Sequence, residues 1–247
     1  MRARVIPCLL LRGHGLVKTR KFKDPVYVGD PVNAVRIFSE KEVDELVILD
    51  IDASREGREP DYELVAEIAG ECFMPVAYGG GVRSLAQARK LIRAGIEKVV
   101  VNSAAVESQG FIREIADVFG SQAVVGAIDA RKTLLGGHRV FVKSGTQDTR
   151  LKPEEHAAVL EQAGVGEIFL NSIDGDGQMQ GYDLGLVQKV TRSVNIPVIA
   201  CGGAGNVTHM KEALAEGGAS AVSAGSMFVF HGKHRAVLIS YLDGTEL

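Results

Sequence analysis

The chain contains an internal repeat with a period close to half its length. Residues 45–106 align with residues 167–228 without a gap, and the same kinds of residue recur at the same places. ELVILDID in the first copy matches EIFLNSID in the second, and MPVAYGGG matches IPVIACGG. In each copy an apolar strand runs into adjacent glycines, an amphipathic helix follows, and a second apolar strand ends in small polar residues. This duplication predicts one body built from two equivalent halves, about residues 1–120 and 121–247, each able to hold an anion.

Composition narrows the class of protein further. The 247 residues are 46% hydrophobic, which is enough for a sizeable core, and the net charge of −3 gives no attraction to nucleic acid or to a membrane. The start, MRARVIPCLLLRG, is too short and too strand-like for a secretory signal. The three cysteines are far apart and odd in number, which favours neither a disulfide framework nor a zinc site. We therefore expect a cytoplasmic protein with no metal and no cofactor.

Short β-branched runs alternate with helical patterns along the whole chain. The expected strands cover residues 5–11, 46–51, 75–78, 98–101, 123–128, 167–171, 197–200 and 219–223. The expected helices cover residues 31–41, 62–72, 85–94, 111–119, 153–163, 184–194 and 207–216. Eight strands alternating with helices and buried on both faces predict a closed (β/α)8 TIM barrel that forms a single domain over residues 1–247.

Two connections are longer than packing requires. Residues 12–30 follow the first strand and carry five basic side chains, and residues 131–152 follow the fifth strand and contain Gly136-Gly137, which predicts a hairpin. Both leave the C-terminal ends of strands, the face on which barrel enzymes place their active sites. A basic flap at that face suits an anionic ligand, and an ordinary solvated loop is the alternative for each connection.

The paired glycines and the small polar residues are candidate phosphate-binding elements. A helix N-terminus offers unpaired N–H groups, and glycine allows a phosphate to approach the backbone closely. The alternative is that these tight turns simply need glycine. The candidates are Gly80, Gly81, Asn102 and Ser103 in the first half, and Gly202, Gly203, Gly225 and Ser226 in the second.

Asp129 is the candidate acid or base. It ends the run VVGAID of the fifth strand, so its carboxylate is expected to point into a pocket at the C-terminal face. The alternative is a helix cap, or a loop ion pair with Arg131 or Lys132. The equivalent position in the first strand is Leu10, which cannot carry a proton.

Several runs resemble the cyclase subunit of imidazole glycerol phosphate synthase over nearly the whole chain, from residue 4 to about residue 230. They are DELVILDI, YGGGVRS, VNSAAV, FGSQAVVGAIDA, GEIFLNSIDGDGQMQGYD and IACGGAG. The resemblance implies a (β/α)8 barrel that docks a glutaminase at its N-terminal face. Ammonia from glutamine then passes through the barrel to a substrate with two phosphates at the opposite face. This chain has no nucleophile-elbow cysteine, so a separate glutaminase partner is expected.

The resemblance also implies roles for particular residues. Phosphate contacts fall at Gly81, Asn102 and Ser103 on one side, and at Asp176, Gly177, Gly203, Gly225 and Ser226 on the other. Lys18 corresponds to a lysine of the flap, and Ser144 falls at a substrate position. The ammonia gate at the barrel entrance maps to Arg4, Glu45, Lys98 and Glu167. Such charges would exclude ions and admit neutral ammonia, and a network that only stabilises the fold is the alternative.

One departure from the family is central. The family uses two catalytic aspartates, which fall at Leu10 and Asp129 here, and the loss of one general acid or base typically costs about 10²–10⁴ in rate. Asp50, Asp52 and Asp176 are the carboxylates that could substitute. The sequence resembles paralogues thought to supply ammonia, with a sugar-amidating ligase, for amidation of a nucleotide-linked sugar in lipopolysaccharide O-antigen synthesis. The other hypotheses are a working cyclase of histidine biosynthesis and a ligand-gated activator of a glutaminase.

Overall fold

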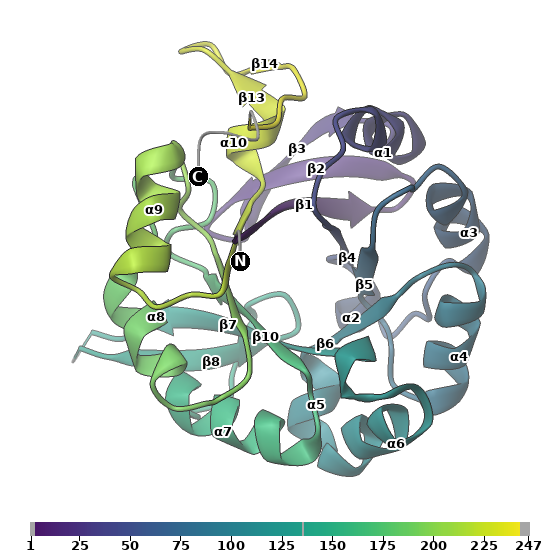
Figure 1. Ribbon diagram of the computed structural model, residues 1–247, viewed down its shortest axis with the longest axis vertical. Coiled ribbons are helices and arrows are strands. Elements are labelled where there is room, and N and C mark those ends of the chain that lie inside the picture. Colours follow the sequence, from purple (N-terminus) through teal and green to yellow (C-terminus); the bar gives the residue numbers. More distant parts are fainter. Residues whose placement is uncertain (1–2, 135, 243–247) are drawn as a thin grey trace.

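Eight parallel strands close into a ring at the centre of the protein (Figure 1). The computed structural model describes residues 3–134 and 136–242. The last barrel strand pairs with the first, with Arg4 opposite Ala221 and Ile6 opposite Ser223, so the ring has no open edge. The predicted (β/α)8 barrel is confirmed. The barrel strands are β1 (Arg4–Arg12), β4 (Leu46–Asp50), β5 (Val76–Gly79), β6 (Lys98–Val101), β7 (Val124–Lys132), β10 (Glu167–Ser172), β11 (Val198–Cys201) and β12 (Ala221–Ala224).

All seven predicted helices are confirmed and surround the barrel (Figure 1). They are α1 (Pro31–Glu40), α3 (Tyr62–Gly70), α4 (Leu85–Arg93), α6 (Gln109–Phe119), α7 (Pro153–Ala163), α8 (Leu184–Thr191) and α9 (Val207–Ala215). Five begin at a side chain that accepts a hydrogen bond from a first-turn backbone N–H, which satisfies a donor the helix cannot pair. These caps are Asp30, Asp61, Ser84, Asp183 and Asn206.

Short helices at the C-terminal strand ends were not predicted, because one turn leaves no periodic pattern in the sequence. They are α2 (Ala53–Glu56), α5 (Ser103–Glu107) and α10 (Ser226–Val229); the 3-10 helix η1 (Ser121–Ala123) instead precedes β7.

An antiparallel hairpin extends one strand in each half of the barrel. In the second half, β7 continues into β8 (His138–Val142) and β9 (Gln147–Asp148), which confirms the predicted hairpin. In the first half, the segment expected to be a loop forms β2 (Gly15–Arg20) and β3 (Lys23–Gly29). Register shifts between β2 and β3 interrupt the strand pattern, which explains why the sequence did not predict them. Both hairpins lie outside the aligned residues 45–106 and 167–228, and each follows the first barrel strand of its half.

The segment after β12 differs from the rest of the outer ring. Within the described residues, α10 is followed by the hairpin β13 (Phe230–His231) and β14 (Ala236–Val237) instead of a long helix. Figure 1 shows this hairpin projecting from the barrel. The chain then returns to the barrel, where the Tyr241 hydroxyl donates to the Val5 carbonyl at 2.8 Å.

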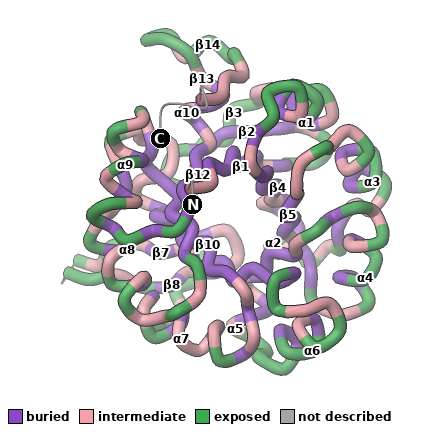
Figure 2. The backbone as a smooth tube through the Cα atoms, viewed as in Figure 1, coloured by how far each residue is buried: buried purple, intermediate pink, exposed green. Residues whose placement is uncertain are grey.

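The core has two layers, and buried backbone follows the barrel strands in Figure 2. The outer layer lies between strands and helices. The second, called here the inner cluster, fills the barrel and consists of Ile6, Cys8, Val47, Ala77, Val100, Val125, Ala127, Phe169, Ile199, Cys201 and Ala221. Among residues 3–134 and 136–242, none of the helices has the length and apolar character that a membrane crossing requires.

Candidate functional site

A cavity of about 490 Å³ opens at the C-terminal ends of the barrel strands. Asp129 and every residue predicted to bind ligand line it, together with Leu10. The predicted ligand residues are Lys18, Gly80, Gly81, Asn102, Ser103, Ser144, Asp176, Gly177, Gly202, Gly203, Gly225 and Ser226. The cavity brings these residues together because the C-terminal ends of parallel barrel strands meet at one face.

Asp129 is buried at the end of β7. Asn102 Nδ2 donates to Asp129 Oδ2 at 2.7 Å. Burial and the nearby charge of Asp176 raise the pKa of Asp129 to about 7, although hydrogen bonds from Asn102 and Asn171 favour the carboxylate. The alternative ion pairs are not formed: Lys132 pairs with Asp183, and Arg131 donates to a backbone carbonyl. A carboxyl group with a pKa near neutrality suits proton transfer.

Leu10 faces the same cavity and packs against the inner cluster. Three other carboxylates could substitute for the aspartate that is absent at position 10, but each already forms hydrogen bonds or an ion pair. Asp50 accepts from the backbone of Asp52 and Ala53, and Asp52 pairs with Arg12. Asp176 accepts from Thr19 Oγ1 at 2.6 Å, and burial raises its pKa.

Lys18 lies on β2 and is 5% exposed, so it is a fixed part of the cavity wall. Its ammonium group donates to the Cys8 carbonyl, and burial lowers its pKa. Ser144 donates to the Ile51 carbonyl, and Ser103 Oγ accepts from Lys143 N at 3.1 Å. Lys18 of β2 and Ser144, which follows β8, therefore line the same cavity.

Two glycines are required by the backbone itself. Gly80 has φ +119° and Gly202 has φ +86°, and a Cβ at either would lie 2.5 Å from a carbonyl oxygen of the preceding strand end. The Gly81 amide donates to Ser54 Oγ at 3.2 Å. The turns alone thus account for these glycines, so phosphate binding at them stays a prediction.

The sequence did not predict every polar residue of the cavity, and Asn171 and Cys201 are two that it missed. Asn171 and Cys201 lie at the ends of β10 and β11 and line the cavity. A hydrogen bond with Cys201 lowers the pKa of Cys8 and raises that of Cys201. In the repeat, Asn171 aligns with Leu49 and Cys201 with Gly79. These differences between the two copies were the signal by which the sequence could have identified both residues.

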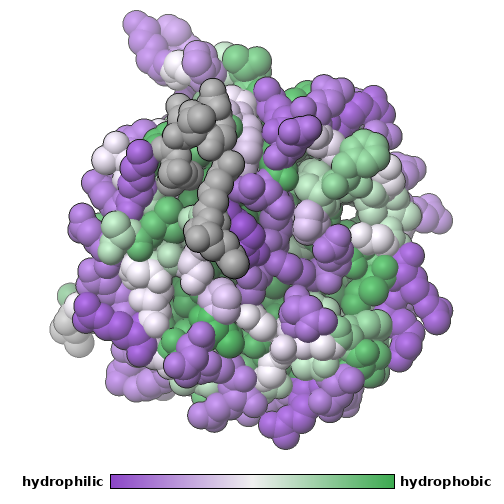
Figure 3. Space-filling model, in the orientation of Figure 1, coloured by the Kyte–Doolittle hydropathy of each residue, from purple (hydrophilic) through white to green (hydrophobic). Residues whose placement is uncertain are grey.

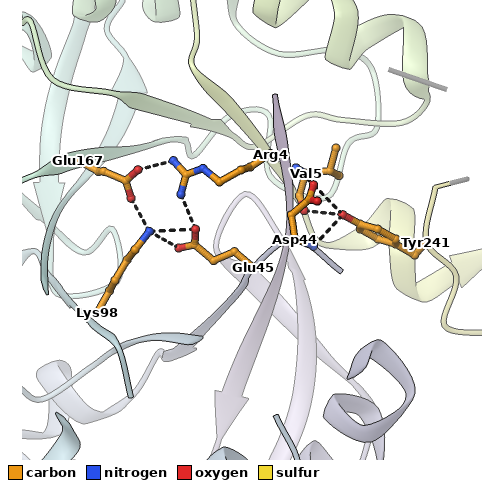
Figure 4. Close-up of polar contacts among 7 residues, drawn as sticks. All are labelled: Arg4, Val5, Asp44, Glu45, Lys98, Glu167 and Tyr241. Atoms are coloured by element: carbon orange, nitrogen blue, oxygen red, sulfur yellow. Dashed lines mark hydrogen bonds and ion pairs between the residues drawn. The ribbon is translucent and has the colours of Figure 1, made fainter. Parts of the chain in front are cut away.

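The four predicted gate residues form a closed ring of ion pairs at the N-terminal ends of the strands (Figure 4). Lys98 Nζ lies 2.9 Å from Glu45 Oε1 and 2.9 Å from Glu167 Oε2, and Arg4 donates to both carboxylates. Burial alone would raise the pKa of Glu167, but hydrogen bonds from Arg4 and Lys98 lower it below its usual value. The structure brings all four together.

The face around this ring is shown in Figure 3. Hydrophilic side chains gather at the centre of the barrel and over the outer helices, with hydrophobic atoms between them. Beside the ring, Val5 N donates to Asp44 Oδ2 at 2.8 Å, and Tyr241 contacts the same carboxylate (Figure 4). Within the part of the chain that the structure describes, no group of three or more His, Cys, Asp or Glu side chains could hold a metal ion.

The fold, the cavity and the ionic ring define a (β/α)8 barrel with a polar site at one end and paired charges at the other. The chain belongs to the family of histidine biosynthesis proteins, whose sequence model matches residues 4–235.

Similar proteins show which members of that family this chain resembles. A Pseudomonas aeruginosa protein, provisionally named imidazole glycerol phosphate synthase subunit hisF2, is 60% identical over 247 residues, 100% of this chain and 98% of its own length. A Leptospira borgpetersenii protein, provisionally named subunit HisF, is 47% identical over 100% of this chain and 97% of its length. A Vibrio vulnificus protein, provisionally named subunit hisF3, is 46% identical over 100% and 95%. The resemblance to the cyclase subunit family is confirmed.

Proposed function

We propose that the protein receives ammonia from a glutaminase at its N-terminal face and conducts it through the barrel to a phosphorylated ligand in the C-terminal cavity. The observation that carries this proposal is the closed ring of Arg4, Glu45, Lys98 and Glu167 at the end of the barrel opposite the cavity. The two positive and two negative side chains pair within the ring, so the ring carries no net charge that would attract or retain an ion.

The apolar barrel interior favours a neutral molecule over an ion. The inner cluster lies between ring and cavity, is apolar, and contains the small side chains of Ala77, Ala127 and Ala221. Transferring an ammonium ion into such an interior costs several kcal/mol even after relaxation, whereas neutral ammonia carries no comparable penalty. Ammonia, and not ammonium, is therefore the species that the interior favours.

The cavity supports an anionic ligand. Lys18 contributes a buried cation, and small polar residues follow the strands in both halves: Asn102 and Ser103 in one, Gly225 and Ser226 in the other. These two groups fit a ligand with a phosphate at each end. The residue roles rest on the family resemblance and on this placement.

Leu10 favours ammonia delivery over cyclisation. The carboxyl group of Asp129 has a pKa near 7, and the position of the second catalytic aspartate is apolar. The acceptor that we propose is a nucleotide-linked sugar of lipopolysaccharide O-antigen synthesis, amidated by a separate ligase that draws ammonia from the cavity.

The test is reconstitution with the glutaminase of the imidazole glycerol phosphate synthase type from the same organism. Sedimentation velocity measures the complex, and glutamate formation measures glutamine hydrolysis. We expect a stable complex and faster hydrolysis in the presence of the barrel. If neither occurs, the proposal is wrong.

A second candidate is cyclisation in histidine biosynthesis, which the retained Asp129 favours. It predicts turnover of the ribulosyl bisphosphate substrate with ammonium salts, and rescue of a histidine auxotroph that lacks its cyclase. Absence of both outcomes would exclude it.

A further inference from the structure

We propose that Tyr241 is a positioning residue of the ionic ring (Figure 4). Its hydroxyl joins the chain segments that carry Arg4 and Glu45, one cation and one anion of the ring. The inference rests on the proposed function only for what the ring does. The positioning itself depends only on hydrogen bonds and packing within this chain.

The pairing between β1 and β4 leaves the beginning of β1 without a strand partner on that side. Among the described residues, this ladder starts at Cys8 and Val47, whereas β1 starts at Arg4. Val5 is 0% exposed, so its peptide N–H and carbonyl need partners inside the protein. Continuing the register of the two strands places Val5 opposite Asp44, which precedes the first residue of β4.

The side chains of Asp44 and Tyr241 take the place of the backbone ladder here. Val5 N donates to Asp44 Oδ2 at 2.8 Å, and the Tyr241 hydroxyl donates to the Val5 carbonyl at 2.8 Å. The same hydroxyl accepts from Asp44 N at 3.3 Å and lies 3.3 Å from Asp44 Oδ2. A phenol both donates and accepts, so Tyr241 bonds to β1 and to the segment before β4 at once.

The segment that carries Tyr241 is fixed on α10. Its aromatic ring packs against Phe228, with 5.4 Å between the ring centroids, and Phe228 is 1% exposed. Ser240 N donates to the Phe228 carbonyl at 2.9 Å, and Leu238 N donates to the Val229 carbonyl at 2.9 Å. The returning chain therefore holds the hydroxyl of Tyr241 at a set place beside the barrel.

These contacts lie next to two members of the ring in the chain. Val5 is the residue after Arg4. Asp44 is the residue before Glu45. The ion pair between Arg4 and Glu45 depends on the separation of their two backbones, since hydrogen bonds weaken steeply with distance and misalignment. Tyr241 sets that separation through the neighbouring peptides and acts on the ring from outside it.

A double-mutant cycle in the isolated chain tests the inference. Tyr241→Phe removes the hydroxyl and keeps the aromatic ring, and Lys98→Met removes a different member of the ionic ring. Urea unfolding at pH 7 gives the factor by which Tyr241→Phe raises the unfolding equilibrium constant in each background. Loss of the bonds to Val5 and Asp44 contributes equally to both factors, whereas loss of ring pairing contributes only where the ring is intact. We expect the factor to be at least about threefold smaller in the Lys98→Met chain.

Equal factors would show that the hydroxyl only pairs buried backbone groups, and would overturn the inference. Tyr27→Phe is the matched control, because Tyr27 is 66% exposed and its factor should be the same in both backgrounds. If the doubly substituted chain fails to fold, 15N NMR of the Lys98 ammonium group in Tyr241→Phe decides instead. We expect its hydrogens to exchange with water at least about threefold faster than in the unsubstituted chain, and an unchanged rate would overturn the inference.

The outcome is independent of the proposed function, because the cycle uses the chain without a glutaminase. Coupling between Tyr241 and Lys98 in a chain that forms no glutaminase complex would leave the positioning role intact and refute the proposed function. A stimulated glutaminase complex without this coupling would refute only the positioning role.

Discussion

Burial of the single residue Asp129 makes the stability of the fold depend on pH. Burial, aided by the charge of Asp176, raises its pKa to about 7 from an ordinary value of 3.8. Between these pH values the folded protein holds this proton more tightly than the unfolded chain does. The stability due to the bound proton is full below about pH 4 and is lost as the pH rises through 7.

Asp129→Asn should therefore stabilise the fold in a pH-dependent way. We expect its free energy of unfolding to exceed that of the unsubstituted protein by roughly 2–4 kcal/mol at pH 8, and the difference to vanish near pH 4. Urea unfolding at both pH values measures this, with the exposed Asp24→Asn as control. The same difference at both pH values would contradict the assignment of this pKa.

Leu10→Asp should restore proton-transfer chemistry if Leu10 is what limits cyclisation. We expect ammonium-dependent turnover of the ribulosyl bisphosphate to rise at least tenfold, in line with the 10²–10⁴ that is typical of a general acid or base. Leu49→Asp is the matched control, because Leu49 pairs with Leu10 on the neighbouring strand and lines the same cavity. An equal rise in both variants would show that any added carboxylate suffices.

Much of the cavity could be predicted because its residues lie where strands end. Asp129, Asn102 and Ser226 follow apolar runs, and a closed barrel places such positions at one face. Asn171 was missed because it ends a run that was interpreted as strand core. Its hydrogen-bonding role depends on its register with Asp129, which no local pattern contains.

At the scale of elements, the loop after β10 holds both hairpins through two carboxylates. Asp176 accepts from Thr19 and from the backbone of Phe22, which fixes the β2–β3 turn. Asp174 accepts from Lys132 N at 2.8 Å, at the start of the β7–β8 hairpin. The two hairpins are thereby attached separately to one short segment beside the cavity.

Removing each carboxylate should release only one hairpin. We expect Asp176→Ala to accelerate amide hydrogen exchange in residues 18–24 and Asp174→Ala to accelerate it in residues 131–134, because each variant loses hydrogen bonds to one turn. Hydrogen exchange measured by mass spectrometry on both variants gives each the other as its control. Equal acceleration of both hairpins in either variant would contradict separate attachment.

The helices and strands also show which elements a sequence pattern can predict and which it cannot. Seven helices were predicted because each presents apolar residues at helical spacing over at least two turns. The β2–β3 hairpin was missed because its basic side chains and register shifts hide the alternation of a strand. The hairpin β13–β14 was missed for another reason: its strands are two residues long.

At the scale of the whole molecule, the ring and the cavity occupy opposite ends of one barrel. The ring joins residues that are up to 163 positions apart in the chain, so only closure of the barrel assembles it. The four charges are visible in the sequence, but their grouping was predicted only from the family resemblance. Glu45 is 2% exposed and Glu167 is 9% exposed, so the two carboxylates of the ring are buried and depend on Arg4 and Lys98 for their pairing.

Lys98→Met should destabilise the fold by leaving two buried carboxylates with one cation. We expect a loss of roughly 2–4 kcal/mol in the free energy of unfolding at pH 7. Lys211→Met, at an exposed position of α9, should change it by less than about 0.5 kcal/mol. Urea unfolding measures both, and an unchanged Lys98→Met would show that the ring contributes no stability.

The most direct measurement follows nitrogen from glutamine to product. The barrel, its glutaminase and the sugar-amidating ligase are supplied with glutamine labelled with 15N in its amide, in excess unlabelled ammonium, and mass spectrometry reads the amidated sugar. We predict product that is almost entirely 15N-labelled, and unlabelled nitrogen entering when Lys98→Met opens the ring to solvent. If the unsubstituted barrel gives product that carries unlabelled nitrogen from the bulk solution, conduction through the barrel is contradicted. The remaining hypothesis would then be that the protein only activates the glutaminase.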